Sequence, residues 1–118
     1  MTRQRSRHAP AIFCPVRDVL AGLLDRWCLL VLFHLAREGR TRFSALEGAI
    51  PDVSPRMLSL RLQELQAAGV VARFVFGEVP PRIEYKLTPS GLALVDALKG
   101  VEAWALEQQV RERGPAGR

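Results

Sequence analysis

Cysteine is scarce in this chain, and long apolar runs are missing. Two cysteines, Cys14 and Cys28, are too few for the disulfide framework of a small secreted protein. The longest apolar run, at 28–36, is too short to cross a bilayer. The N-terminus, MTRQRSRHAP, has no apolar segment behind its charges and therefore does not look like a secretory signal. These absences predict a protein of a bacterial-type cytoplasm that does not act in a membrane.

The known motifs of catalysis and metal binding are missing as well. The sequence has no Cys-x-x-Cys pair, no residue order typical of a catalytic triad and no glycine-rich phosphate loop. Two histidines, His8 and His34, accompany the cysteines, but their spacing fits no familiar zinc motif. We therefore expect no enzymatic activity, no cofactor and no metal site.

Positive charge, by contrast, is in excess. The chain has 17 Lys and Arg against 12 Asp and Glu, which gives a formal net charge of +5 and a pI of about 10.2. This balance favours an anionic partner, with nucleic acid before a membrane surface. Nearly all of the charge is arginine, which suits bidentate contacts with phosphate and guanine. Residues 1–11 carry Arg3, Arg5 and Arg7 without any acid and predict a flexible basic arm.

The chain length of 118 residues predicts one domain, which we place at 12–109, between the arm at 1–11 and a disordered tail at 110–118. Up to Gly69 the apolar residues recur three and four apart, which is typical of helices. After Gly69 the period changes to two, which is typical of strands. The expected elements are helices at 12–24, 27–37, 41–50, 54–68 and 88–109, and strands at 70–76 and 82–87. Their order is that of a winged helix-turn-helix, a mainly helical α+β fold with a small β-hairpin.

The expected helix at 54–68 has two different faces. Its apolar stripe consists of Leu58, Leu62 and Leu65, spaced four and three apart. In a helix-turn-helix such a stripe packs on the preceding helix, and the opposite face enters the major groove. There arginine and glutamine can read guanine and adenine, serine can bond bases or phosphates, and leucine can touch a thymine methyl group. The residues of this face are Arg56, Ser59, Leu60 and Gln63.

Two questions about this helix stay open at the level of the sequence. An ordinary amphipathic surface helix would show the same two faces. Arg61 flanks the apolar stripe and can either reach a phosphate or pair with a nearby acid.

The start of this helix carries its own signals. Ser54 is a good N-cap, and Pro55 suits the first position of a helix.

The expected hairpin also carries positive charge. An arginine at the tip of a wing can enter the minor groove or hold phosphates. Arg82 is the best-placed candidate because it directly follows the Pro80-Pro81 tip. The predicted wing and backbone contacts are Arg73, Arg82, Lys86 and Arg42. A solvated charged hairpin is the alternative. The side chains expected in the core are Phe74, Phe76, Tyr85 and Leu87.

Five segments form a specific combination: CPV at 14–16, RW at 26–27, RFSAL at 42–46, SPRMLSLRLQELQAAGVV from Ser54 and VPPRIEYKLTPSG at 79–91. Together they resemble the HxlR-type winged-helix transcriptional regulators of bacteria over most of the chain. The resemblance implies a homodimer on a (pseudo)palindromic operator, with Ser54 and Pro55 joining the recognition surface. It also implies a dimer interface between the N-terminal and C-terminal helices. The corresponding residues are Val16, Leu20, Leu94, Leu98, Val101, Trp104 and Ala105.

The resemblance gives Cys14 a second possible role. Several regulators of this type sense oxidants or electrophiles through a cysteine just before the first helix, and Cys14 matches that position. A helix N-terminus stabilises a thiolate, and Arg17 is near in the sequence. Modification of Cys14 would then shift the two recognition helices of a dimer. The alternative is a cysteine packed as a small hydrophobe, and Cys28, in the most apolar helix, is expected to be inert core.

From these observations we expect a homodimeric, sequence-specific regulator of transcription that binds double-stranded DNA. Repression is expected rather than activation, because a dimer bound near a promoter occludes polymerase. A thiol oxidant or a small ligand between the subunits is the expected effector. The alternative is a winged helix that binds a protein or RNA, since a fold does not fix a function. A small thiol enzyme is a third class, which the missing motifs disfavour.

Overall fold

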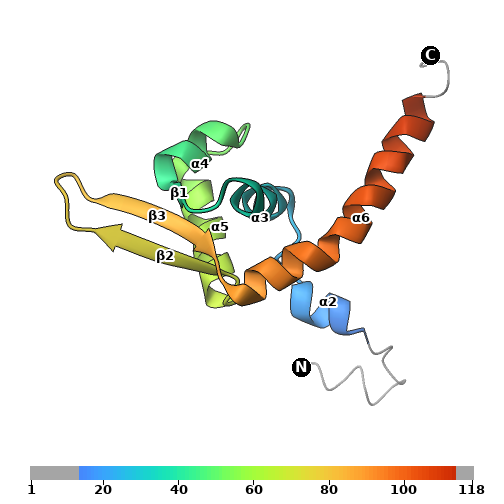
Figure 1. The fold of residues 1–118 in the computed structure, drawn as a ribbon, viewed down its shortest axis with the longest axis horizontal. Coiled ribbons are helices and arrows are strands. Elements are labelled where there is room, and N and C mark those ends of the chain that lie inside the picture. The colour runs from blue at the N-terminus through green and yellow to red at the C-terminus, as the bar shows by residue number, and fades with distance from the viewer. Residues whose placement is uncertain (1–13, 114–118) are drawn as a thin grey trace.

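The computed structural model describes residues 14–113, which form several helices and a small antiparallel sheet (Figure 1). The elements are α2 (Pro15–Leu20), α3 (Arg26–Glu38), β1 (Thr41–Arg42), α4 (Phe43–Ala49), α5 (Pro55–Ala67), β2 (Val71–Phe76), β3 (Arg82–Leu87) and α6 (Pro89–Arg113). This is the winged helix-turn-helix fold that the sequence predicts. The basic arm, the first residues of the helix predicted at 12–24 and the tail beyond residue 113 lie outside the described residues. No helix in the described range is long and apolar enough to cross a membrane.

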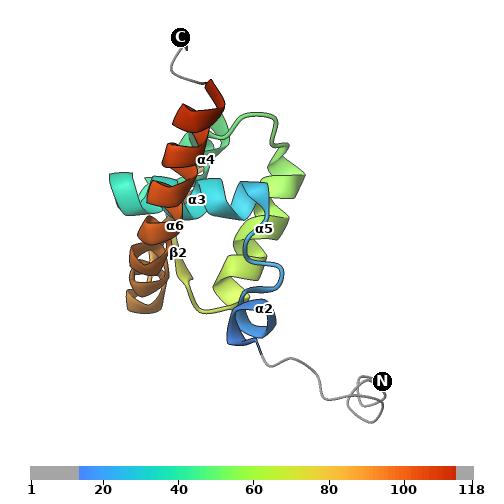
Figure 2. The same ribbon diagram turned by 90° about the vertical axis from the view of Figure 1, so that its right-hand side faces the viewer.

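Helix α3 occupies the centre of the fold and crosses between α5 and α6 (Figure 2). It begins after Asp25, whose carboxylate accepts a hydrogen bond from the Cys28 N–H at 2.7 Å. It ends at Gly39, whose φ of 80° is unfavourable for other residues. The residues of α3 and α5 that are buried in the common core are Cys28, Val31, Leu32, Leu35, Leu58, Leu62 and Leu65. Burying one such leucine contributes about 1.5–3 kcal/mol, so this contact fixes the orientation of α5.

The sheet has the strand order β1–β3–β2, and both pairs of neighbours are antiparallel. Side chains alternate between its faces. Tyr85, Leu87 and Arg73 share the inner face, which packs on the helices, and Phe74 and Phe76 lie on the outer face. The prediction that Phe74 and Phe76 belong to the core is therefore wrong, because both lie half-buried on the outer face.

Strand β1 is an element that the sequence does not predict. The apolar pattern predicts a helix from Thr41, whereas Thr41 and Arg42 pair with Tyr85 and Glu84 of β3. This pairing gives β3 a neighbour on both sides and satisfies backbone groups that would otherwise lie at a sheet edge. Helix α4 begins only at Phe43.

Helix α2 is shorter than the helix predicted at 12–24. It ends at Leu20, and the chain then turns through Gly22, which has a φ of 84°. The turn buries Leu23 in the core and leaves Leu24 exposed. Apolar spacing alone does not distinguish such a turn from a continuing helix.

Helix α6 has a buried first half and an exposed second half. Val95 and Leu98 are buried in the first half. Beyond them the helix extends away from the body of the molecule (Figure 1). It continues through Arg113, past the predicted end near Gln109 and into the segment that the sequence predicts as a disordered tail.

The start of α6 leaves no room for a side chain at Gly91. A Cβ there would collide with the carbonyl oxygen of Val70, which is held in place because it accepts a hydrogen bond from the Thr88 N–H. In urea unfolding we expect Gly91→Ala to lower the free energy of unfolding by about 2 kcal/mol, as in overpacked sites. Gly100→Ala, in the same helix with no atom near the added Cβ, should raise it by about 0.5–1 kcal/mol. Equal effects of the two substitutions would contradict the close contact.

Candidate nucleic-acid interface

Helix α5 follows a tight turn, and the turn and the N-cap fix the residue at which the helix begins. Asp52 in this turn has a φ of 61°. The Ser54 hydroxyl oxygen accepts a hydrogen bond from the Met57 N–H at 3.0 Å, and Pro55 occupies the first position of the helix. The cap and the proline were both predicted, and the structure confirms them in these positions.

The side of α5 that faces away from the buried stripe is accessible. Arg56 and Gln63 are exposed, Leu60 keeps 40% of its surface in solvent, and Ser59 is half-buried. The structure thus places all four predicted reading residues at the surface. Their role as base contacts stays a prediction.

A groove of about 480 Å³ lies between α5 and the β2–β3 hairpin. Its lining residues are Phe43, Ser59, Gln63, Gln66, Arg73, Ile83 and Tyr85. The hydroxyl, amide and guanidinium groups among them can donate hydrogen bonds to phosphates or base edges. Gln66 is a lining residue that sequence reasoning missed. Its position three residues after Gln63, on the same side of the helix, is the signal that could have revealed it.

The four predicted wing and backbone contacts lie on two faces of the sheet. Arg73 is exposed on the inner face and lines the groove. Lys86 and Arg42 are exposed on the outer face. Arg82 also lies on the outer face, with its Nε 3.0 Å from a carboxylate oxygen of Glu84. Of these four residues, the structure brings only Arg73 to the groove beside α5.

Arg61 joins α5 to the start of α3. Its Nε lies 2.5 Å from Asp25 Oδ2, its Nη1 lies 3.5 Å from Glu64 Oε1, and its guanidinium lies 5.7 Å from the centre of the Trp27 ring. Of the two alternatives for Arg61, the structure shows pairing with nearby acids. Because Asp25 also caps α3, one carboxylate holds both helices. Sequence reasoning did not find this contact, since its two partners are far apart in the chain.

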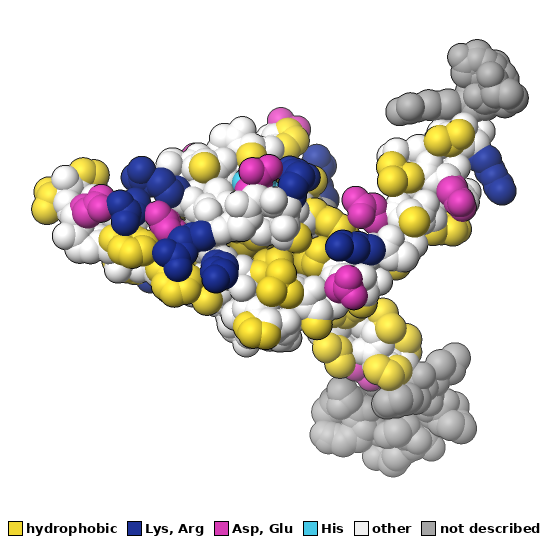
Figure 3. Space-filling model, viewed as in Figure 1, with side chains coloured by type: hydrophobic (Ala, Val, Ile, Leu, Met, Phe, Trp, Pro, Cys, Tyr) yellow, Lys and Arg dark blue, Asp and Glu magenta, His cyan; other side chains and the backbone are white. Residues whose placement is uncertain are grey.

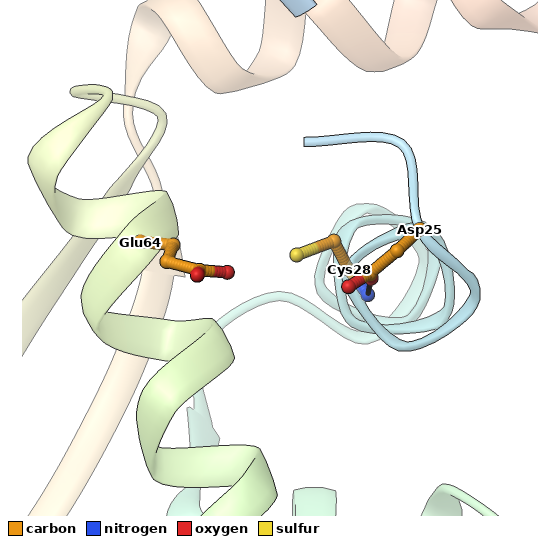
Figure 4. Close-up of side chains that lie close together, drawn as sticks. All are labelled: Asp25, Cys28 and Glu64. Carbon is orange, nitrogen blue, oxygen red and sulfur yellow. Dashed lines mark hydrogen bonds between the residues drawn. The ribbon is translucent and has the colours of Figure 1, made fainter. Parts of the chain in front are cut away.

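Asp25, Cys28 and Glu64 come close together (Figure 4), and Arg61 contacts two of them. One potential ligand atom of each lies within 4.8 Å of the others. Arg61 already pairs with both carboxylates, so the cluster accommodates a guanidinium. Burial, together with the carboxylates of Asp25 and Glu64, raises the pKa of the Cys28 thiol from 9.0 to about 12. A completely buried, neutral thiol is unreactive, and the burial agrees with the predicted core role of Cys28.

Cys14 lies half-buried at the N-terminus of α2. Its sulfur accepts a hydrogen bond from the Arg17 N–H at 3.4 Å. The Arg17 guanidinium, however, pairs with Asp18 at 2.8 Å. The charge of the Arg17 guanidinium is therefore paired with a carboxylate of the same helix. Sensing by Cys14 stays a prediction that rests on its position.

The residues predicted at a dimer interface divide into two groups. Leu98 is buried in the core of the single chain, and Leu20 and Leu94 pack against that core. These three residues therefore stabilise the chain itself. Val16, Val101, Trp104 and Ala105 are exposed. Val101, Trp104, Leu106 and Val110 each keep more than half of their surface in solvent, and we call these four residues the α6 apolar surface. At about 100° per residue, Val101 and Trp104 lie on one side of the helix, whereas Leu106 and Val110 lie on another.

Comparison with protein families gives a match over most of the chain. The model of the HxlR-like helix-turn-helix family matches residues 23–113. Among curated proteins, the HTH-type transcriptional regulator YvaP of Bacillus subtilis is 45% identical over 95 residues. The matched region covers 80% of this chain and 87% of YvaP.

Solved structures show the same fold. The transcriptional regulator ytfH from Salmonella typhimurium matches with a TM-score of 0.72 and 38% identity, covering 87% of this chain and 94% of that chain. The redox regulator HypR in its reduced form matches with a TM-score of 0.75 and 32% identity, covering 81% of this chain and 94% of that chain.

The raised pKa of Cys28 predicts a pH dependence of stability. Between pH 9 and about 12 the unfolded chain loses the thiol proton while the folded chain keeps it. The folded state then binds more protons, so the free energy of unfolding falls as the pH rises, by up to about 1.4 kcal/mol per pH unit. Urea unfolding at pH 8, 9.5 and 10.5 should show this loss in the wild type relative to Cys28→Ala. A difference between the two proteins that does not change with pH would contradict the assignment.

Proposed function

The chain belongs to the HxlR-like helix-turn-helix family, and from this premise we propose that it is a homodimeric, sequence-specific DNA-binding regulator of transcription. The observation that carries the proposal is the exposed side of α5. Its buried leucines hold the helix on the core, so that Arg56, Leu60 and Gln63 face solvent. A helix with such a side fits the major groove, where these residue types can distinguish base pairs.

The groove beside α5 supports the same proposal. When a helix lies in the major groove, the sugar–phosphate backbone passes along its flank. Gln66 lines the groove from α5, and Arg73 lines it from β2. We propose that they bind the backbone there and fix the register of α5, while the residues on the exposed side of the helix read the bases.

The α6 apolar surface supports a homodimer. Trp104 is 61% exposed, and three further apolar side chains of the same half-helix are similarly exposed. Exposed apolar residues on more than one side of a projecting helix support contact with another chain. A second copy with the same surface would cover it symmetrically. Two α5 helices would then occupy successive major grooves of a (pseudo)palindromic operator, where a bound dimer represses by excluding polymerase.

The operator is tested by fluorescence anisotropy on the DNA upstream of the protein's own coding region and on scrambled DNA, at one physiological salt concentration. We expect a preference of about a thousandfold for the upstream DNA. Arg56→Ala should reduce this preference by about tenfold to a hundredfold, because it removes a base contact. Equal binding to both DNAs would contradict the operator and favour a protein or RNA partner.

Two further variants separate the causes of any change in binding. Arg37→Ala removes the same charge from the exposed end of α3 and should leave the preference unchanged. Trp104→Glu places a charge in the α6 apolar surface and should shift the sedimentation of the protein from dimer to monomer, with weaker operator binding. A Trp104→Glu protein that remains a dimer would place the interface elsewhere.

We further propose that Cys14 makes operator binding responsive to oxidants or electrophiles. Cys14 is a half-buried free cysteine at the N-cap of α2, close in sequence to the exposed Val16. HypR, whose structure this chain resembles, is a redox regulator solved in its oxidised and reduced forms. A group added to the sulfur of Cys14 would alter the packing of α2 and thereby the distance between the two recognition helices.

The sensor role is tested by treating the protein with diamide before the anisotropy measurement. We expect the operator affinity of the wild type to change by about tenfold, a usual size for coupling between sites. Cys14→Ser should not respond, whereas Cys28→Ala should respond like the wild type because Cys28 is buried. A Cys14→Ser protein that responds fully would remove Cys14 from the mechanism.

A further inference from the structure

The outer face of the β2–β3 hairpin carries a stack of arginine and phenylalanine side chains. The strand register places Phe74 opposite Glu84 and Phe76 opposite Arg82, so these side chains share one face. The Arg82 guanidinium lies 4.3 Å from the centre of the Phe76 ring. Arg82 therefore covers an aromatic ring of its own hairpin.

A second arginine reaches the same rings from outside the hairpin. Arg40, between α3 and β1, has its guanidinium 4.7 Å from the Phe74 ring centre and 6.0 Å from the Phe76 ring centre. A guanidinium above a ring is attracted by the negative ring face and shields its apolar surface. Figure 3 shows Lys and Arg side chains next to acidic and hydrophobic ones over the hairpin. The two phenylalanines that the core leaves out are thus covered by cations.

Glu84 lies between the two arginines. One carboxylate oxygen is 3.7 Å from Arg40 Nε, the other is 3.0 Å from Arg82 Nε, and only 15% of the side chain is exposed. Glu78, in the loop at the hairpin tip, pairs with Arg82 Nη1 at 2.5 Å. The Arg82 guanidinium is therefore occupied by two carboxylates and one ring.

The outer part of the hairpin needs such support. Strand β1 pairs with β3 only at Tyr85 and Glu84, so the residues nearer the tip belong to two strands alone. Two isolated strands are marginally stable in water. Single exposed ion pairs add little, but here two pairs share a largely buried carboxylate and hold both cations over the rings.

We propose that Arg40, Glu84 and Arg82 form a clamp that sets the position of the wing, and that Arg82 is a positioning residue rather than a contact to DNA. The phosphate contact of the wing is then Arg73, which is exposed on the opposite, inner face beside α5. The clamp itself does not depend on DNA. The assignment of Arg73 and Arg82 rests on the proposed function.

Native-state hydrogen exchange of the full chain without DNA tests the clamp. Glu84→Gln keeps the shape of the side chain and removes its charge. We expect the amides of the outer hairpin to exchange about fivefold faster than in the wild type, while those of α5 keep their rates. Glu102→Gln removes the same charge from the exposed half of α6 and should leave the hairpin unchanged. Unchanged hairpin exchange in Glu84→Gln would overturn the clamp.

The salt dependence of binding to the upstream DNA distinguishes positioning from contact. Each lost phosphate contact reduces the slope of log affinity against log salt by about 0.9. We expect Arg73→Ala to show this reduction. Arg82→Ala should weaken binding by about threefold with an unchanged slope. Arg82→Lys should weaken it equally, because lysine has no planar group to lie on the ring while pairing with two carboxylates.

Two results would overturn the role assigned to Arg82. One is a slope for Arg82→Ala that falls as it does for Arg73→Ala. The other is full retention of affinity by Arg82→Lys, because lysine keeps a positive charge for a phosphate but loses the planar group that lies on the ring. If the wild type itself shows no preference for its upstream DNA, the proposed function fails, and the exchange experiment still decides whether the clamp exists.

Discussion

Three leucines of α5 pack into the core without any exposed surface, and this contact fixes the rotation of the helix about its own axis. Residues on the other side of the helix therefore face solvent. The ion pair between Arg61 and Asp25, at the edge of the stripe, opposes any rotation, since turning α5 would separate the two charges. The surface that α5 offers to a binding partner is therefore determined by an apolar contact inside the chain, which the partner does not touch. Rigid support of this kind is what precise recognition by a side chain requires.

The net charge of the chain indicates an anionic partner but does not show which cations would meet it. Arg61 and Arg82 face carboxylates of the same chain and are partly buried. Arg40 is more exposed but also pairs with a carboxylate while covering the ring of Phe74. Arg56 and Arg73, in contrast, are exposed on or beside α5. The net charge counts the paired and the exposed arginines alike. Of the two groups, only the exposed arginines can neutralise phosphates without breaking an existing ion pair.

What the sequence predicts correctly depends on local signals. The helices α3 and α5 and the strands of the hairpin were predictable because apolar period, caps and glycine stops lie within each segment. Strand β1 and the turn at Leu23 could not be predicted from the sequence, because both depend on contacts with segments distant in the chain. The exposed side of α5 follows from the helical period alone. The contact between Arg40 and Glu84 does not, since it depends on the pairing of β1 with β3.

Helix α3 contacts both α5 and α6, so the orientation of one is coupled to that of the other. Tightly packed interiors transmit small displacements rather than absorbing them. In the proposed dimer, contacts between the exposed halves of two α6 helices would help to set the distance between the two α5 helices. A small change at this interface would then reach α5 through Val95 and Leu98 and through the core of α3, without any change in the recognition helix itself.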